Sequence, residues 1–164
     1  MDRRRAIALL AVSTQALAQP GRANPLIGCW NLRSCVRTLR NGQTQYPFGP
    51  ESVGRIEYDK AGRMFALLMR PGRRTTVHPG MELDQAPMDE LRGIVTGFVS
   101  YFGSYDVDQE GRSVTHHVEA SLVPSWVGTD LKRNFHFEGS RLVLTRVSPD
   151  STSSDRLTLD REPD

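Results

Sequence analysis

The stretch LIGCWNLRSC, residues 26–35, begins the first predicted strand, and apolar and polar side chains alternate along it. Successive residues of an extended chain point to opposite faces of a sheet. The alternation therefore predicts a strand with one buried and one solvated face. By this rule the inward residues are Trp30, Leu32 and Val36, and the outward ones are Asn31, Arg33 and Arg37.

The same two-residue alternation recurs along the chain, and short links that contain glycine join several of the segments, as in antiparallel hairpins. Eight such strands can bury their apolar faces by closing into a barrel, which removes the exposed edges of an open sheet. The sequence therefore predicts an all-β fold, an eight-stranded antiparallel up-and-down barrel. The predicted strands are residues 29–39, 53–59, 63–69, 101–108, 113–122, 128–137, 141–147 and 155–161.

Residues 85–98 have helical periodicity instead. Pro87 suits the start of a helix, and Asp89 and Glu90 favour its first turn. We expect one helix between strands 3 and 4 of the barrel, packed against the barrel wall. The apolar residues that recur every three or four positions are Leu91, Ile94, Val95 and Phe98.

The first residues, MDRRRAIALLAVSTQALAQ, have a basic start, a short apolar run and a small-x-small ending, as in a cleaved export signal. The run is shorter than the roughly 20 residues that span a bilayer. We expect residues 1–18 to be a signal peptide and residues 19–164 to be one exported domain, periplasmic or secreted, without a stable membrane anchor. The alternative is a frayed N-terminal helix of a cytosolic protein, and the arginines leave the Sec and twin-arginine routes both open.

The charge of the chain gives no reason to expect a nucleic-acid partner. The three arginines and one aspartate of the leader carry the same net charge, +2, as the whole chain. The rest is therefore near neutral, and its one basic cluster, RPGRR at residues 70–74, has the Pro-Gly of a solvated loop.

The cysteines of the opening stretch allow two further hypotheses. Leu26 to Cys29 has the pattern of a lipoprotein lipid-attachment box, but QPGRANP puts a charge and two prolines between the apolar run and Cys29. Cys29 and Cys35 could form a disulfide, but six residues of continuous strand span about 20 Å, whereas bridged Cα atoms lie within about 7 Å. We expect no such bridge, and both cysteines on the outer face.

The alternation places four polar side chains, Tyr58, Tyr105, His116 and Arg133, inside an otherwise apolar barrel. Small-molecule sites combine apolar walls with a few polar groups, and Arg133 would suit a carboxylate. Alternatively, Arg133 and His116 pair with neighbours or water near one barrel end. The other residues predicted to face inward are Ile56, Val107, Val114, Val118, Ala120, Leu122, Leu131, Phe135, Phe137, Leu157, Leu159 and Arg161.

The segment QTQYPFGPESVG, residues 43–54, is rich in Pro, Gly and aromatics and is too broken to be a strand. Tyr46 and Phe48 could form an apolar lid over the barrel mouth, or they could belong to a packed surface loop. We include both residues, together with Phe135, among the candidate ligand contacts.

Motifs for metal, cofactor or covalent chemistry do not appear in the sequence. Adjacent strand residues point to opposite faces, so His116 and His117 cannot bind one metal ion. The sequence contains no nucleophile elbow, phosphate-binding Gly-Lys loop or dinucleotide fingerprint. We therefore expect neither a metal nor a cofactor.

Several stretches resemble the bacterial lipocalin-like domain family: GCW, YPFGP, GRIEYDKAGRMFALLMRP, GFVSYFGSYDVD and THHVEASLVPSWVGTD. The resemblance covers most of residues 26–161. It implies a calycin-type barrel with an internal pocket, and no particular reaction. It also implies that Trp30 packs across a barrel floor against a basic residue of the last strand, here Arg161, with Gly28 making room beside it.

The leading hypothesis is an exported carrier that encloses a small apolar molecule, which can bear an acidic group. The first alternative is an isomerase, cyclase or hydratase with His116 as base and Tyr58 or Tyr105 as acid, which requires these groups to meet in one cavity. The second is an envelope interaction or stress protein whose barrel serves only as a scaffold, which requires an exposed apolar patch.

Overall fold

The computed structural model describes residues 23–78 and 80–163, so the predicted signal peptide lies outside the described residues. The described chain is mostly β-strand, with one α-helix and two short 3₁₀ helices. The elements are β1 (Gly28–Leu39), β2 (Thr44–Gln45), β3 (Val53–Tyr58), β4 (Arg63–Met69), η1 (Leu83–Gln85), α1 (Met88–Thr96), β5 (Phe98–Asp108), β6 (Ser113–Ser121), η2 (Pro124–Trp126), β7 (Asp130–Glu138), β8 (Arg141–Val147) and β9 (Ser153–Arg161).

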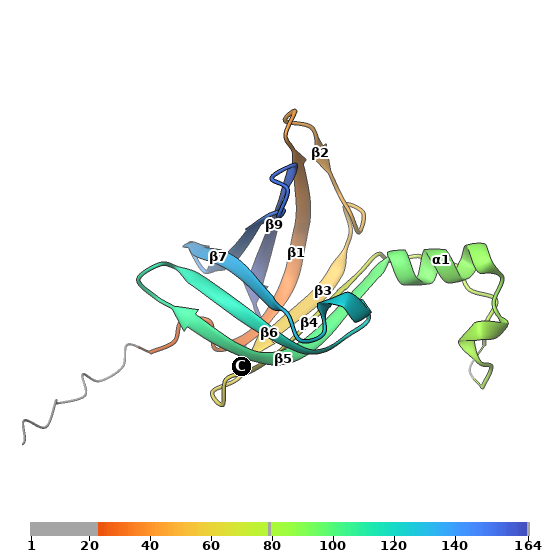
Figure 1. The fold of residues 1–164 in the computed structure, drawn as a ribbon, viewed down its shortest axis with the longest axis horizontal. Coiled ribbons are helices and arrows are strands. Elements are labelled where there is room, and N and C mark those ends of the chain that lie inside the picture. Colours follow the sequence, from red (N-terminus) through yellow and green to blue (C-terminus); the bar gives the residue numbers. More distant parts are fainter. Residues whose placement is uncertain (1–22, 79, 164) are drawn as a thin grey trace, which may run out of the picture.

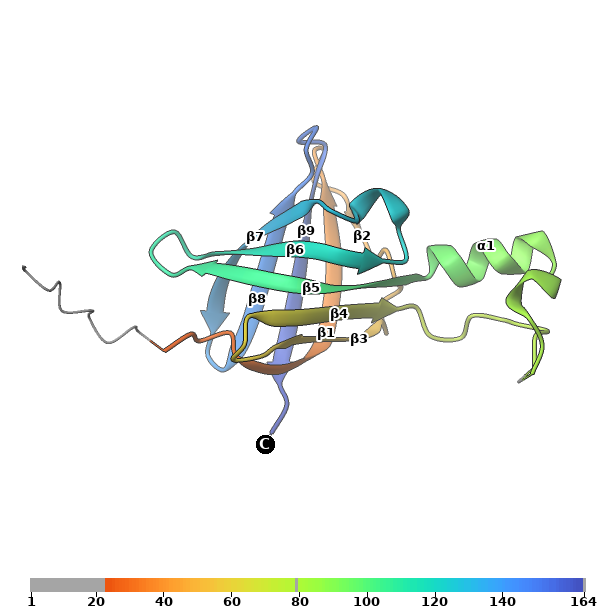
Figure 2. The same ribbon diagram turned by 60° about the horizontal axis from the view of Figure 1, so that its bottom comes forward.

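The strands form a closed antiparallel barrel in which β1 pairs with β3 and each strand from β3 to β8 pairs with the next one along the chain. Strands β1 and β3 to β9 form the eight-stranded barrel wall. The barrel closes where β9 pairs with β1, from Leu39↔Ser153 to Trp30↔Arg161. Figures 1 and 2 show β3 to β6 crossing in front of β1 and β9, the first and last strands of the barrel. The predicted all-β, eight-stranded up-and-down barrel is confirmed. Within residues 23–78 and 80–163 the only added strand is β2, a two-residue piece paired with β1 in the segment that was expected to be too broken for a strand.

One end of the barrel is closed by Trp30. Its ring is 1% exposed, its Nε1–H donates to the carbonyl of Leu26 over 2.7 Å, and the guanidinium carbon of Arg161 lies 4.3 Å from the ring centre. Arg161 in turn donates to the carbonyls of Ile27 and Pro25. Gly28 has φ +131, and a Cβ there would lie 2.6 Å from Arg161 Nη1. We call this end, made by Gly28, Trp30 and Arg161, the floor, and the opposite end the mouth.

A bulge in β1 changes which side chains enter the barrel. The register with β9 shifts between Leu32 and Ser34, so Cys35 pairs with inward Leu157 and is 3% exposed. A bulge inserts one residue and reverses the alternation beyond it. The predictions that Cys35 and Arg37 face outward and Val36 inward are therefore wrong. Cys29 and Cys35 are both free thiols.

A second irregularity, between β5 and β6 at Phe102 and Gly103, reverses the faces at the end of β6. Ala120 pairs there with outward Phe102, and Leu122 is exposed, so both were wrongly predicted to face inward. Phe137, at the end of β7, is 39% exposed, but it pairs with inward Leu142 and its ring centre lies 6.0 Å from that of Trp30, so it faces the floor. Of the other positions predicted to face inward on β3, β6 and β9, all but Arg161 are buried: Ile56, Tyr58, Val114, His116, Val118, Leu157 and Leu159.

Helix α1 connects β4 to β5, the third and fourth strands of the barrel wall, which confirms its predicted place in the chain order. It does not pack on the barrel, however. Figures 1 and 2 show it extending away from the strands, and none of its residues is buried. Its anchors are local, through Arg73, which donates to the carbonyl of Ile94 and stacks over Phe98. No helix in the described ranges is long and apolar enough to cross a membrane.

Candidate functional site

A cavity of about 180 Å³ lies inside the barrel toward the mouth. Its walls are largely aromatic and aliphatic, and the polar residues among them come from β1, β5, β7, β8 and β9. A small apolar chamber with a few polar groups is typical of ligand sites. The lining residues are Arg37, Phe48, Ile56, Leu68, Val99, Tyr101, Trp126, Arg133, Arg146, Asp155 and Leu157.

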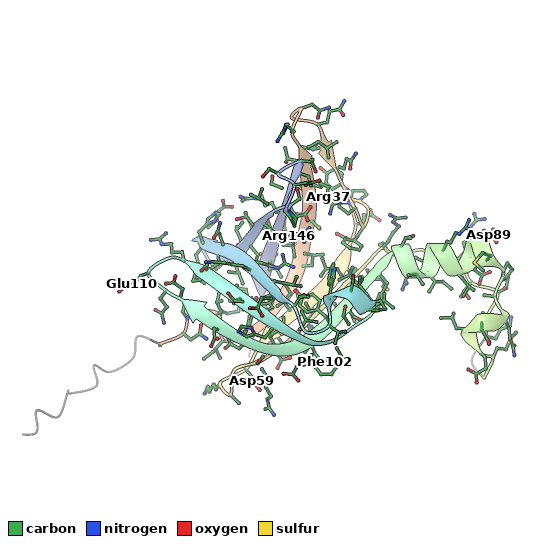
Figure 3. All side chains as sticks on the ribbon, viewed as in Figure 1. Arg37, Asp59, Asp89, Phe102, Glu110 and Arg146 are labelled. Atoms are coloured by element: carbon green, nitrogen blue, oxygen red, sulfur yellow. The ribbon has the colours of Figure 1, made fainter. Side chains whose placement is uncertain are left out.

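The polar part of this lining has more positive than negative charge. Asp155, on β9, accepts two hydrogen bonds from Arg37, over 2.7 and 3.2 Å, and a third from Arg146 over 3.0 Å. Figure 3 shows Arg37 and Arg146 close together at the mouth end of the barrel. Arg133 also lines the cavity, so the lining has three guanidinium groups and one carboxylate. The cavity is therefore electropositive.

Two of these arginines have unused hydrogen-bond donors. The Nε–H groups of Arg133 and Arg146 are buried and have no hydrogen-bond partner among the described residues. An unsatisfied buried donor costs about 1–3 kcal/mol. A ligand oxygen that accepts from these groups would therefore gain more than the same contact in water.

The arginine pairing also controls the charge of Asp155. Burial alone would raise the pKa of this carboxyl group, but hydrogen bonds from Arg37 and the charges of Arg37 and Arg146 outweigh burial and lower it. Asp155 is consequently ionised at neutral pH. Cys35 lies near it, and burial, followed by the charge of Asp155, raises the pKa of the thiol to about 11.

Below the cavity, a hydrogen-bonded cluster fills the barrel. The His116 ring is fully buried between two tyrosines, with its Nε2 2.8 Å from the Tyr58 hydroxyl and its Nδ1 2.9 Å from the Tyr101 hydroxyl. Arg133 Nη2 lies 3.4 Å from the same Tyr101 oxygen. Burial, followed by the charge of Arg133, holds the pKa of His116 well below its ordinary value. His116 is thus a neutral imidazole. His117 faces outward between Asp106 and Asp130.

The sequence profile of a family described as a lipocalin-like domain matches residues 27–160 of this chain. This match covers the barrel described above from the start of β1 to Asp160 in β9. The chain belongs to the lipocalin-like domain family.

A curated relative has a carrier function. The 4'-hydroxy-3'-methoxypropiophenone carrier protein of Aspergillus oryzae is 35% identical over an alignment of 92 positions that covers 52% of this chain and 81% of that protein. Membership of the lipocalin-like domain family and similarity to a carrier both support small-molecule binding by this chain.

The structure brings only some of the predicted site residues to the cavity of this lipocalin-like domain. Arg133 and Phe48 line it. Tyr46 is 51% exposed and does not border the cavity. Tyr58 and His116 lie behind Tyr101, Tyr105 donates to the carbonyl of Asp59 near the floor, and Phe135 borders a separate hollow at that end.

Five polar or aromatic lining residues were missed at the sequence level, for different reasons. Tyr101 and Asp155 have the same strand parity as Tyr105 and Leu157, and Arg146 that of Leu144, so consistent alternation would have found them. Arg37 was placed on the wrong face because the β1 bulge between Leu32 and Ser34, which reverses the alternation, has no simple sequence signal. Trp126 lies in η2, outside any strand, where alternation does not apply.

The acid–base alternative lacks the geometry that it requires. Neither His116 nor Tyr58 nor Tyr105 borders the cavity, and both ring nitrogens of His116 are occupied by tyrosines. A substrate in the cavity would meet Tyr101 before it reached His116. In this barrel His116 and Tyr58 therefore form part of the filled interior.

Other hollows lie outside the barrel. One of about 680 Å³ lies beside α1 and is lined by arginines and acidic residues, including Arg73, Arg74 and Glu90. Another, of about 310 Å³, crosses the outer faces of β4 to β6, where Phe65 and Phe102 are exposed. The latter is an apolar outer surface of the kind that the scaffold hypothesis requires. Neither hollow is enclosed by the barrel.

Proposed function

We propose that this protein is a carrier for a small, single-ring aromatic or similarly compact apolar molecule with an acidic or other oxyanion group. The observation that carries the proposal is the cavity lining, in which three arginines, Arg37, Arg133 and Arg146, accompany a single carboxylate, Asp155, and the Nε–H groups of Arg133 and Arg146 are buried without a partner among the described residues. Arginine donors bind carboxylate oxygens strongly because the hydrogen bonds are charge-assisted. The apolar walls, including Phe48 and Trp126, would contact the rest of the ligand.

The size of the cavity limits the ligand. An apolar cavity of about 150 Å³ holds one benzene molecule, so a cavity of about 180 Å³ suits one ring with a short substituent. The Aspergillus oryzae relative is named for carrying a substituted phenyl ketone, which is also a single-ring compound with oxygen acceptors. A long-chain fatty acid exceeds this volume, and we expect it to bind poorly.

The first prediction concerns Arg133. In Arg133→Met, the affinity for 3-phenylpropionate should fall about 10-fold or more, because a charge-assisted hydrogen bond contributes about 1.5–3 kcal/mol. Affinity for propylbenzene, which has no charged group, should change little, since methionine retains the apolar stem. Isothermal titration calorimetry of both compounds measures the difference.

The matched control is Arg33→Met. Arg33 lies on the outer face of β1, with its side chain 59% exposed, so its loss should leave both affinities unchanged. Quenching of Trp126 fluorescence on binding, absent in Trp126→Phe, would place the ligand in the cavity. Equal affinity of wild type and Arg133→Met for the acid would refute the oxyanion proposal, and no binding of either compound would refute the carrier proposal.

We also propose export of the carrier, on the basis of the leader-like composition of residues 1–18. The test is the intact mass of the protein after expression of the full chain in a bacterial host, fractionated into cytoplasm and periplasm. Cleavage before Gln19 with recovery in the periplasm is the expected result. An uncleaved cytoplasmic product would overturn this part of the proposal.

A further inference from the structure

The cluster beneath the cavity contains a chain of hydrogen bonds whose direction matters for the ligand. Tyr58, His116 and Tyr101 are linked in series through the two nitrogens of the imidazole, over 2.8 and 2.9 Å. A neutral imidazole has one N–H donor and one acceptor nitrogen. One tyrosine must therefore donate to His116 and the other must accept from it.

The environment of Tyr58 determines the direction of this chain. The Tyr58 side chain is 1% exposed, and within residues 23–78 and 80–163 its hydroxyl makes a hydrogen bond to His116 alone. If Nε2 carried the imidazole proton, the Tyr58 O–H would have no acceptor in a closed interior, at the cost of an unsatisfied buried donor. Tyr58 therefore donates to Nε2, and the proton of His116 is on Nδ1.

The opposite end of the chain then lies at the cavity. Nδ1–H donates to the Tyr101 oxygen, toward which Arg133 Nη2 also points over 3.4 Å. Two donors on this oxygen leave the hydroxyl proton of Tyr101 free to be donated elsewhere, and Tyr101 lines the cavity. In the opposite tautomer, the Tyr101 O–H would donate its hydrogen bond to His116 Nδ1 and would not be available to a ligand.

We propose that His116 is a positioning residue that sets Tyr101 as a hydrogen-bond donor into the cavity, so that the site selects ligands that present an acceptor oxygen, such as a carbonyl or carboxylate. This inference rests on the proposed carrier function and sharpens its ligand class. Tyr101 and the free Nε–H groups of Arg133 and Arg146 are all donors, and the one lining carboxylate, Asp155, is already engaged by arginines. A ligand oxygen thus meets several donors, whereas a ligand group that can only donate finds no free acceptor carboxylate.

The binding test compares propiophenone, which has a carbonyl acceptor, with propylbenzene, which has a similar shape and none. In Tyr101→Phe the affinity for propiophenone should fall about 5-fold or more, the equivalent of one hydrogen bond, and that for propylbenzene should not change. Tyr105→Phe is the matched control, because its hydroxyl bonds to Asp59 and Asn24 away from the cavity. It should leave both affinities unchanged. Equal losses for both compounds in Tyr101→Phe would overturn the proposal.

The tautomer provides a second test that needs no ligand. In wild-type protein labelled with nitrogen-15 histidine, the His116 ring should show its proton on Nδ1 and should not titrate between pH 5 and 8. The assignment is checked by loss of the signal in His116→Gln or, if that variant does not fold, by the absence of titration. A proton on Nε2 would overturn the inference. If the tautomer is as expected but neither compound binds, the carrier proposal fails instead.

Discussion

Trp30→Ala is expected to lower the free energy of unfolding by about 3–5 kcal/mol, as for large-to-small changes of a buried aromatic residue. The ring is 1% exposed and closes the floor between the first and last strands. Its removal leaves a cavity at this end and leaves the Leu26 carbonyl without its Nε1–H donor. It also removes the ring on which Arg161 stacks. Urea unfolding followed by circular dichroism measures the loss.

A double-mutant cycle separates stacking from burial. Trp30→Leu keeps an apolar side chain but removes the aromatic ring, and Arg161→Met keeps the stem but removes the charge. The coupling energy of the two changes should be about 0.5–2 kcal/mol, the range for a cation–π contact. A loss below about 2 kcal/mol in Trp30→Ala would contradict the role of this ring as the floor.

Asp155→Asn should lower the free energy of unfolding by about 2–3 kcal/mol at pH 7. Removal of one partner from a buried ion pair costs about 3–5 kcal/mol, and the partial exposure of Arg37 and Arg146, with side chains 37% and 29% exposed, reduces this cost. The change leaves three arginines without a carboxylate at the cavity. The same substitution should therefore raise the affinity for 3-phenylpropionate, so that stability and binding change in opposite directions.

The effect of Asp155 should depend on pH. Because pairing lowers the pKa of Asp155 in the folded state, its stabilisation is present above the unfolded value of about 4 and is lost as the pH falls through the folded pKa. The difference in stability between wild type and Asp155→Asn should thus be largest near pH 7 and shrink toward pH 2. A difference that is constant over this range would contradict the pairing.

Asp160→Asn is the matched control. Asp160 lies on the same strand and also bonds two arginines, Arg141 over 2.9 Å and Arg33 over 3.5 Å, but on the outer face. Its side chain is 45% exposed, and exposed ion pairs contribute about 0–1 kcal/mol. We expect a small loss of stability and no change in ligand affinity.

The site illustrates how far strand parity predicts an interior. Parity placed Arg133 inside correctly, and the same rule applied throughout would have added Asp155 and Tyr101. It could not show depth along the barrel axis, however. By parity alone, Tyr58, His116 and Arg133 are all predicted to face the interior. Only Arg133 borders the cavity, because the register of the strands sets the position of each residue along the barrel axis.

Local sequence determined the barrel itself, because alternating side chains specify strands, short glycine-containing links specify antiparallel neighbours, and Trp30 and Arg161 lie at the two ends of the strand series. The β1 bulge, by contrast, depends on pairing with β9, more than a hundred residues away, and it alone brings Arg37 to Asp155. The direction in which α1 extends likewise depends on contacts with residues outside the helix, such as Arg73, which the periodicity of the helix does not predict. Closure, register and the protons shared by a buried cluster are properties of distant segments in contact, and only the tertiary structure decides them.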